Sequence, residues 1–208
     1  MTAKAPKTSI RADNEANIIA AAESVFAEFG LKGATTAEIA RRANVPKANL
    51  HYYFSTKEAL YRVVLERILT LWLKAADSLD QNDEPDVALA RYIGAKMDLA
   101  RSLPLGSQIW ASEIMRGAHI IQDFLETTLA DWVAAHELVL NRWIGEGKIH
   151  PLTPRTLFFM IWATTQHYAD FAPQIATLNS GRALSDTEFD AAKAQVIEII
   201  VRGVVKQG

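Results

Sequence analysis

The stretch TTAEIARRANVPKANLHYYFSTK, from Thr35 to Lys57, decides the fold of this chain. Apolar residues at helical spacing predict one helix over residues 37–43 and a second, about two turns long, over residues 46–52. A third helix is expected to begin after Ser55. A short helix joined to another by a tight turn is typical of the helix-turn-helix arrangement.

Capping signals mark where these helices begin. Thr35 with Glu38, and Ser55 with Glu58, match the capping box, in which a hydroxyl and a carboxylate bond the free backbone N–H groups at a helix start. We therefore expect Thr35 and Ser55 to be the N-terminal caps of the first and third of these helices.

The turn between the two short helices has signals of its own. Asn44 tolerates the left-handed backbone conformation that a tight turn needs. Pro46 restricts Val45 to extended conformations and suits the first position of the next helix. The exposed positions of that helix are expected to carry hydrogen-bond donors, namely Lys47, Asn49, and His51 or Tyr52.

Charge is divided unevenly along the chain. The 208 residues carry a net charge of −2 at pH 7, which by itself argues against binding to nucleic acid. Residues 1–67, however, hold ten basic against seven acidic side chains, a net of +3, and residues 68–208 hold twelve against seventeen, a net of −5. A basic end on an acidic body predicts that only the N-terminal part meets phosphate. The polar segment from Met1 to about Arg11 is interpreted as a disordered tail or as a basic arm on DNA.

No stretch alternates with period two over the length of a strand, so the chain is predicted to be all-α, with about nine helices. Half of its residues are hydrophobic, which is enough for a substantial core. The first helix is expected to run from a cap at Asp13 or Asn14 to Phe29, with Phe29 on its apolar face. Beyond the opening stretch, helices are expected at about residues 56–80, 87–101, 105–116, 119–145, 154–172 and 186–205, with a loop over 177–185.

Several classes of protein are disfavoured by what the sequence lacks. It has no cysteine, no apolar N-terminal segment, and no apolar run longer than Leu157–Ala163. These features exclude a disulfide framework and predict neither a secretory signal nor a membrane span. We therefore expect a cytoplasmic protein that does not contact a membrane.

The residues from Ala21 to Tyr61, AAESVFAEFGLKGATTAEIARRANVPKANLHYYFSTKEALY, closely resemble the head of the TetR family of bacterial transcription regulators. The likeness rests on Thr36, Ile39, Ala40, Val45, Tyr52, Tyr53, Phe54, Lys57 and Leu60. The resemblance implies a DNA-binding helix-turn-helix domain over residues 1–56, and a ligand-binding and dimerisation domain over residues 57–208.

The same resemblance implies how the head meets operator DNA. The second helix of the motif would enter the major groove, because that is how the family docks. Lys47 and Asn49 would then reach base edges or phosphate. The remaining DNA-binding candidates are Thr36 and Tyr52 on phosphates, Lys57 near the DNA backbone, and His51.

The helix expected over residues 159–173 is apolar nearly all round, which predicts burial in the core or in an interface. Trp162, Gln166 and Asp170 lie at i, i+4 and i+8 and form one stripe on it. Aromatic walls with a few polar groups are typical of small-ligand pockets, and a carboxamide offers the donor and acceptor that match a uracil or thymine edge. The competing interpretation is that Gln166 and Asp170 only tie helices together.

A narrower resemblance within the family favours the pocket. The stretches FMIWATTQHYADFA (Phe159–Ala172) and RILTLWL (Arg67–Leu73) resemble members that regulate pyrimidine utilisation. This implies uracil or thymine as a small-molecule effector, with no cofactor. The ligand-binding residues it implies are Trp72, Trp162 and Gln166, followed by Tyr168 and Asp170.

The last two expected helices, residues 154–172 and 186–205, carry broad apolar faces. The family resemblance implies that they form a four-helix interface in a homodimer, whose two heads suit a two-fold operator. The effector is expected to shift the helical rod that begins near Lys57 and passes Trp72, and so to change the spacing of the heads.

Together these features predict a ligand-responsive transcriptional regulator, with repression of pyrimidine metabolism favoured over activation. Two alternatives stay open: a regulator of the same fold that senses a larger hydrophobic compound, and a small-molecule enzyme that keeps the helix-turn-helix as a packing unit. The chain has no nucleophile motif, no Gly-rich phosphate loop and only scattered histidines. We therefore expect no catalytic residue and no metal site.

Overall fold

The computed structural model describes residues 7–75, 79 and 83–206. Within these residues all regular structure is helical, apart from an isolated bridge between Ile149 and Val205. The predicted all-α class is therefore confirmed. When the consecutive segments α7, η2 and α8 are counted as one helix, the described residues form ten helices. None of these helices is long and apolar enough to cross a membrane.

The described residues divide into two compact units. The first holds the chain up to Ile68 together with Gln108–Gln122, and the second holds Leu69–Ser107 and the chain from Asp123 onward. Two helices, α4 (Lys57–Ala75) and α6 (Pro104–Met115), each begin in one unit and end in the other. The units are defined by packing, whereas the expected division between residues 56 and 57 is one of function and stays a prediction.

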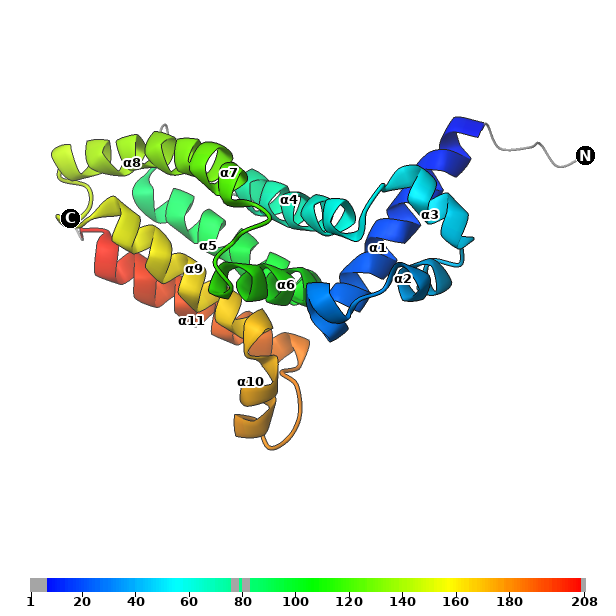
Figure 1. Cartoon of the computed structure of the whole chain (residues 1–208). Coiled ribbons are helices and arrows are strands. Elements are labelled where there is room, and N and C mark those ends of the chain that lie inside the picture. The colour runs from blue at the N-terminus through cyan, green and yellow to red at the C-terminus, as the bar shows by residue number, and fades with distance from the viewer. Residues whose placement is uncertain (1–6, 76–78, 80–82, 207–208) are drawn as a thin grey trace, which may run out of the picture. The chain divides into compact units, whose positions relative to one another are not determined.

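The first unit contains the opening stretch. Its three N-terminal helices are α1 (Lys7–Gly33), α2 (Thr36–Arg42) and α3 (Lys47–Tyr53) (Figure 1). Their shared core consists of almost fully buried apolar side chains: Ile18, Ala22, Val25, Phe26, Ile39, Leu50 and Phe54. The turn before α3 is tight because Asn44 adopts a φ of 53°, in the left-handed region, as predicted.

Helix α1 departs from the sequence expectation at both ends. It begins at Lys7, so the segment up to Arg11 is helical where a tail or arm was expected; Met1 to Pro6 lie outside the described residues. Gly30, with a φ of 64°, interrupts the helix before its last turn. Phe29 is half exposed and does not lie in the core. One face of its ring lies against the guanidinium of Arg42, 5.6 Å from the ring centroid.

The cap of α2 is only half of the expected capping box. The Thr35 hydroxyl accepts a hydrogen bond from the Glu38 backbone N–H at 3.1 Å. The Glu38 carboxylate, in contrast, accepts from the side chains of Arg41 and Arg42. The arginines thus take the carboxylate that was expected to bond the backbone of Thr35.

The cap of α4 is Thr56, and the expectation of Ser55 is wrong by one residue. The Thr56 hydroxyl accepts a hydrogen bond from the Ala59 N–H at 3.0 Å, and the helix begins at Lys57. The Ser55–Glu58 pattern was misleading because two adjacent residues carry hydroxyls and only one of them reaches the third backbone N–H. The expected end of this helix, near residue 80, lies outside the described residues.

Replacing Thr56 with Ala is expected to lower the free energy of unfolding by about 1 kcal/mol, because the Ala59 N–H loses its acceptor. The matched change Ser55→Ala removes a neighbouring hydroxyl and is expected to change stability by less than about 0.5 kcal/mol. Urea unfolding followed by circular dichroism measures both. Equal losses, or a larger loss for Ser55→Ala, would contradict the assignment of the cap.

The second unit is a bundle in which α5 packs against α9 and α11, and α9 packs against α8 and α10 (Figure 1). These helices are α5 (Pro85–Ser102), α8 (Ala130–Gly145), α9 (Pro154–Asp170), α10 (Ala172–Leu178) and α11 (Asp186–Val204). The core between them is large and apolar, and includes Leu89, Tyr92, Ile93, Met97, Trp143, Leu157, Phe158, Ile161 and Phe189. The helices expected in this region therefore form, with bounds shifted by a few residues.

Two elements of this unit differ in kind from the expectation. Helix α10 was not expected, because the preceding helix was predicted to end at about residue 172 and a loop was predicted over residues 177–185. Pro173 lies in the first turn of this helix, where its missing N–H is tolerated. The helix expected over residues 119–145 begins later, with α7 (Gln122–Phe124), and passes through a π-helical turn, η2 (Leu125–Leu129), before α8.

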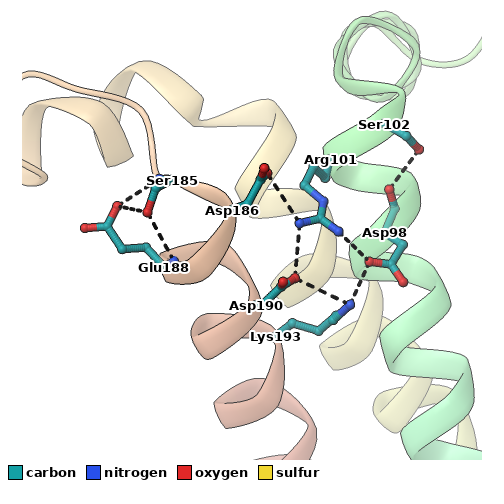
Figure 2. Close-up of polar contacts among 8 residues, drawn as sticks. All are labelled: Asp98, Arg101, Ser102, Ser185, Asp186, Glu188, Asp190 and Lys193. Atoms are coloured by element: carbon teal, nitrogen blue, oxygen red, sulfur yellow. Dashed lines mark hydrogen bonds and ion pairs between the residues drawn. The ribbon is translucent and has the colours of Figure 1, made fainter.

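Exposed ion pairs join α5 to α11. Arg101 of α5 bonds Asp190 of α11 at 3.1 Å, and Lys193 of α11 bonds Asp98 of α5 at 2.8 Å (Figure 2). Each such pair contributes at most about 1 kcal/mol in water. Because each helix contributes one basic and one acidic side chain, a shift of α11 along α5 would place like charges together. The ion pairs therefore favour the observed register of the two helices.

Candidate functional site

The outward face of α3 presents the donor side chains that were expected there. Lys47, Asn49 and His51 are exposed, and Tyr52 is 71% exposed. Leu50, on the inward face, is fully buried. The helix is thus anchored by one apolar side chain, while its polar side chains are accessible to a large ligand.

A cation from α1 lies beside this face. The guanidinium of Arg11 lies 5.6 Å from the centroid of the Tyr52 ring, a cation–π distance. The ring of Tyr53 meets Tyr52 edge to face at 5.4 Å between centroids. Arg11 therefore adds positive charge next to α3, from a helix rather than from the tail or arm that the sequence predicted.

Two other DNA-binding candidates lie at the edges of the motif. Thr36 is half buried in the first turn of α2. The ammonium of Lys57 donates a hydrogen bond to the backbone carbonyl of Ala34 at 2.9 Å. Lys57 thus ties the start of α4 to the segment between α1 and α2, a structural role that was not foreseen; its contact with DNA stays a prediction.

The arginines of α2 are held by acidic neighbours. Arg41 and Arg42 bond Glu38 at 2.6 and 2.7 Å, and Arg42 also bonds Glu28 at 2.7 Å. The hydrogen bonds from Arg41 and Arg42 lower the pKa of Glu38 to about 2. These arginines are neutralised locally, so they add less positive potential to the head than their number suggests.

In the second unit, the three residues of the predicted stripe on α9 are all half buried, but their surroundings differ. The indole N–H of Trp162 donates to the Tyr92 hydroxyl at 2.7 Å. Asp170 accepts a hydrogen bond from the Ser107 hydroxyl at 2.6 Å. Within the part of the chain that the structure describes, the Gln166 carboxamide makes no side-chain hydrogen bond. Its donor and acceptor therefore have no partner among the described residues.

The structure adds a charged group that sequence reasoning missed. Lys96, in the middle of α5, is only 4% exposed, and its Nζ lies 4.2 Å from the centroid of the Trp72 ring. Desolvation lowers the pKa of the Lys96 ammonium to about 7, and the Asp170 carboxylate opposes this shift. Burial likewise raises the pKa of Asp170, against the effects of Ser107 and Lys96. Lys96 thus lies against Trp72, and burial disfavours its charged form.

Tyr168 lies in a different place from these residues. Its ring meets Phe189 of α11 edge to face at 5.7 Å, and it lines a groove of about 160 Å³ with Pro104 and Ile175. The contacts of the five ligand-binding candidates therefore fall into separate groups. Trp72 contacts Lys96, and Asp170 contacts Ser107. Trp162 belongs to an aromatic group with Tyr92, and Tyr168 faces the groove.

The outer faces of α9 and α11 are apolar and exposed. Phe159 and Met160 of α9 are more than half exposed, and Ile199 of α11 is 71% exposed. A groove of about 290 Å³ separates the two helices, lined by Leu152, Thr153, Thr156, Leu157, Met160, Ile199, Ile200, Gly203 and Val204. Exposed apolar surface that extends over two helices is typical of a protein–protein contact.

Two family profiles together match nearly the whole chain. Residues 18–64 match the profile described as bacterial regulatory proteins, tetR family. Residues 65–207 match the profile described as YcdC-like protein, C-terminal region. The boundary between the two profiles falls within α4.

Comparison with known proteins agrees with these profiles. The HTH-type transcriptional regulator RutR of Escherichia coli (strain K12) is 36% identical over 187 residues, which cover 90% of this chain and 88% of that protein. The structure of the ketosteroid transcriptional regulator KstR2 of Mycobacterium tuberculosis superposes with a TM-score of 0.75 at 21% identity, covering 93% of this chain and 95% of that chain. A bacterial regulatory protein in the tetR family from Rhodococcus RHA1 superposes with a TM-score of 0.73 at 18% identity, covering 94% and 98%. At such identities the two structural likenesses concern the fold alone.

Proposed function

Because this chain belongs to the TetR family of bacterial transcription regulators, we propose that it is a homodimeric repressor whose operator binding is controlled by uracil or thymine. Membership of the family makes it a DNA-binding transcriptional regulator with a small-molecule effector, rather than an enzyme. The effector's identity, the dimer, repression and a cytoplasmic location are the parts that we propose.

The observation that carries the effector proposal is the half-buried Gln166 on α9, whose carboxamide has no partner among the described residues. A carboxamide matches the N–H and C=O pair on the edge of a pyrimidinedione ring. The same helix, like the segment around Trp72, resembles the corresponding parts of pyrimidine-responsive members of the family. A flat ring also suits the indole surfaces nearby.

Helix α4 offers a route from the effector to the DNA. It carries both Lys57, at its start in the first unit, and Trp72, in the second unit. We propose that effector binding near Trp72 displaces α4 and thereby alters the position of the DNA-binding head. Effector and operator would then weaken each other's binding by the same factor.

The effector proposal is tested by calorimetric titration of the wild-type protein with uracil and with thymine. We expect binding of at least one of them, and a reduction in operator affinity of about 5- to 150-fold at saturating ligand. Absence of binding at millimolar ligand would exclude a pyrimidine effector and leave the regulator itself unaffected. Binding that leaves operator affinity unchanged would exclude the proposed control.

A further inference from the structure

The guanidinium of Arg11 lies over the exposed ring of Tyr52. Its Cζ atom is 5.6 Å from the ring centroid, a distance at which a cation is attracted to an aromatic face. Arg11 is exposed near the start of α1, and Tyr52 is exposed in the last turn of α3. Both residues belong to the first unit, in which the start of α1 lies beside α3 (Figure 1). The two side chains therefore form one exposed surface, cationic and aromatic, on the head.

The charge of Arg11 is not compensated by a carboxylate. On α2, Arg41 and Arg42 bond Glu38 at 2.6 and 2.7 Å, which neutralises much of their charge. Arg11 forms no ion pair within the part of the chain that the structure describes. A guanidinium carries five N–H donors in one plane. Contact with a ring uses the face of this plane, so the donors on its edge can still bond an anion.

The position of Tyr52 along α3 indicates which part of the DNA this surface meets. In helix-turn-helix proteins, the N-terminal residues of the recognition helix contact base edges. Lys47 and Asn49 occupy that end of α3, whereas Tyr52 lies in its last turn. Side chains outside the base contacts meet phosphate and sugar, which fix the register of the protein on the duplex. A phosphate also suits the guanidinium, because its oxygens can accept two parallel N–H bonds.

We propose that Arg11 binds a phosphate of the operator backbone, and that the Tyr52 ring positions its guanidinium for this contact. Helix α1 then contributes to DNA binding from outside the helix-turn-helix, beside the helix that reads the bases. The proposal rests on DNA binding by the family and is independent of the identity of the effector.

The first test is the affinity of Arg11→Ala for DNA, measured by fluorescence anisotropy over a range of salt concentrations. The ligands are an operator selected from random duplex DNA with the wild-type protein, and a scrambled duplex. For each Arg11 in the complex we expect about tenfold weaker binding to both duplexes, the equivalent of one hydrogen bond to a charged group. The slope of log K against log salt concentration should become shallower by about 0.9 for each lost phosphate contact.

Lys32→Ala is the matched control, because Lys32 is exposed at the other end of the same helix. It removes the same charge and should leave the salt slope unchanged. Alanine suits an exposed helical position, so Arg11→Ala should melt at the temperature of the wild type. An unchanged salt slope in Arg11→Ala would exclude the phosphate contact, and a loss confined to the operator would assign Arg11 to a base instead.

The second test repeats Arg11→Ala in two variants of Tyr52. Tyr52→Phe keeps the ring, so Arg11→Ala should weaken binding by the same factor as in the wild type. Tyr52→Ala removes the ring, so the factor should be at least about twofold smaller, the lower limit for residues coupled by contact. Equal factors in the two variants would overturn the positioning role of Tyr52.

Discussion

A variant that carries both Lys47→Ala and Asn49→Ala is expected to bind its operator at least about 100-fold more weakly than the wild type. Both side chains are exposed on the outward face of α3, the helix that enters the major groove in this family. A good contact to a base edge is worth about 1–3 kcal/mol of discrimination, so the loss of two such contacts removes most specific binding. Neither change touches Leu50, which anchors the helix, so the thermal stability of the head should be preserved.

The measurement requires an operator, which is obtained by selection from a random pool of duplex DNA with the wild-type protein. Fluorescence anisotropy then gives the affinity of each variant for this operator and for a scrambled duplex at one salt concentration. Lys32→Ala is the matched control, because Lys32 is exposed in the last turn of α1 and away from α3. A double variant that retains wild-type discrimination between operator and scrambled DNA would exclude this docking of α3.

The head could be predicted well because its structure depends on neighbours in the sequence. Asn44 and Pro46 determine the turn through their own backbone preferences, and the burial of Leu50 follows from helical spacing. The error in the cap of α4 arose because two adjacent residues both carry a hydroxyl that can cap a helix. Thr56 and Ser55 are equivalent as sequence signals, and only the path of the chain selects Thr56 as the cap.

The site in the second unit could be predicted only in part. Periodicity along α9 placed Trp162, Gln166 and Asp170 on one stripe, but it contains no information about the helices that pack against them. Lys96 lies on α5, which packs on α9, so no local pattern along α9 reveals it. A lysine within an amphipathic helix is ordinarily solvated, and its burial here follows from tertiary packing.

Ile199→Glu is expected to convert the proposed dimer into a monomer and to weaken operator binding by about 10²- to 10⁴-fold. Ile199 is 71% exposed on the outer face of α11, beside the apolar groove that α11 forms with α9. In a two-fold interface each substitution occurs twice, so two carboxylates would be buried without partners. A monomer presents a single head, and it loses the gain of about 10²- to 10⁴-fold that comes from joining two binding sites.

Sedimentation velocity measures the state of assembly, and anisotropy with the selected operator measures the affinity. Leu138→Glu is the matched control: Leu138 of α8 is also 71% exposed, but it does not line the groove between α9 and α11. The same charge placed there should leave both the dimer and the affinity unchanged, which separates loss of the interface from a general effect of added charge. A wild-type protein that sediments as a monomer while binding its operator specifically would refute the proposed dimer. An Ile199→Glu variant that stays dimeric would place the interface elsewhere on the chain.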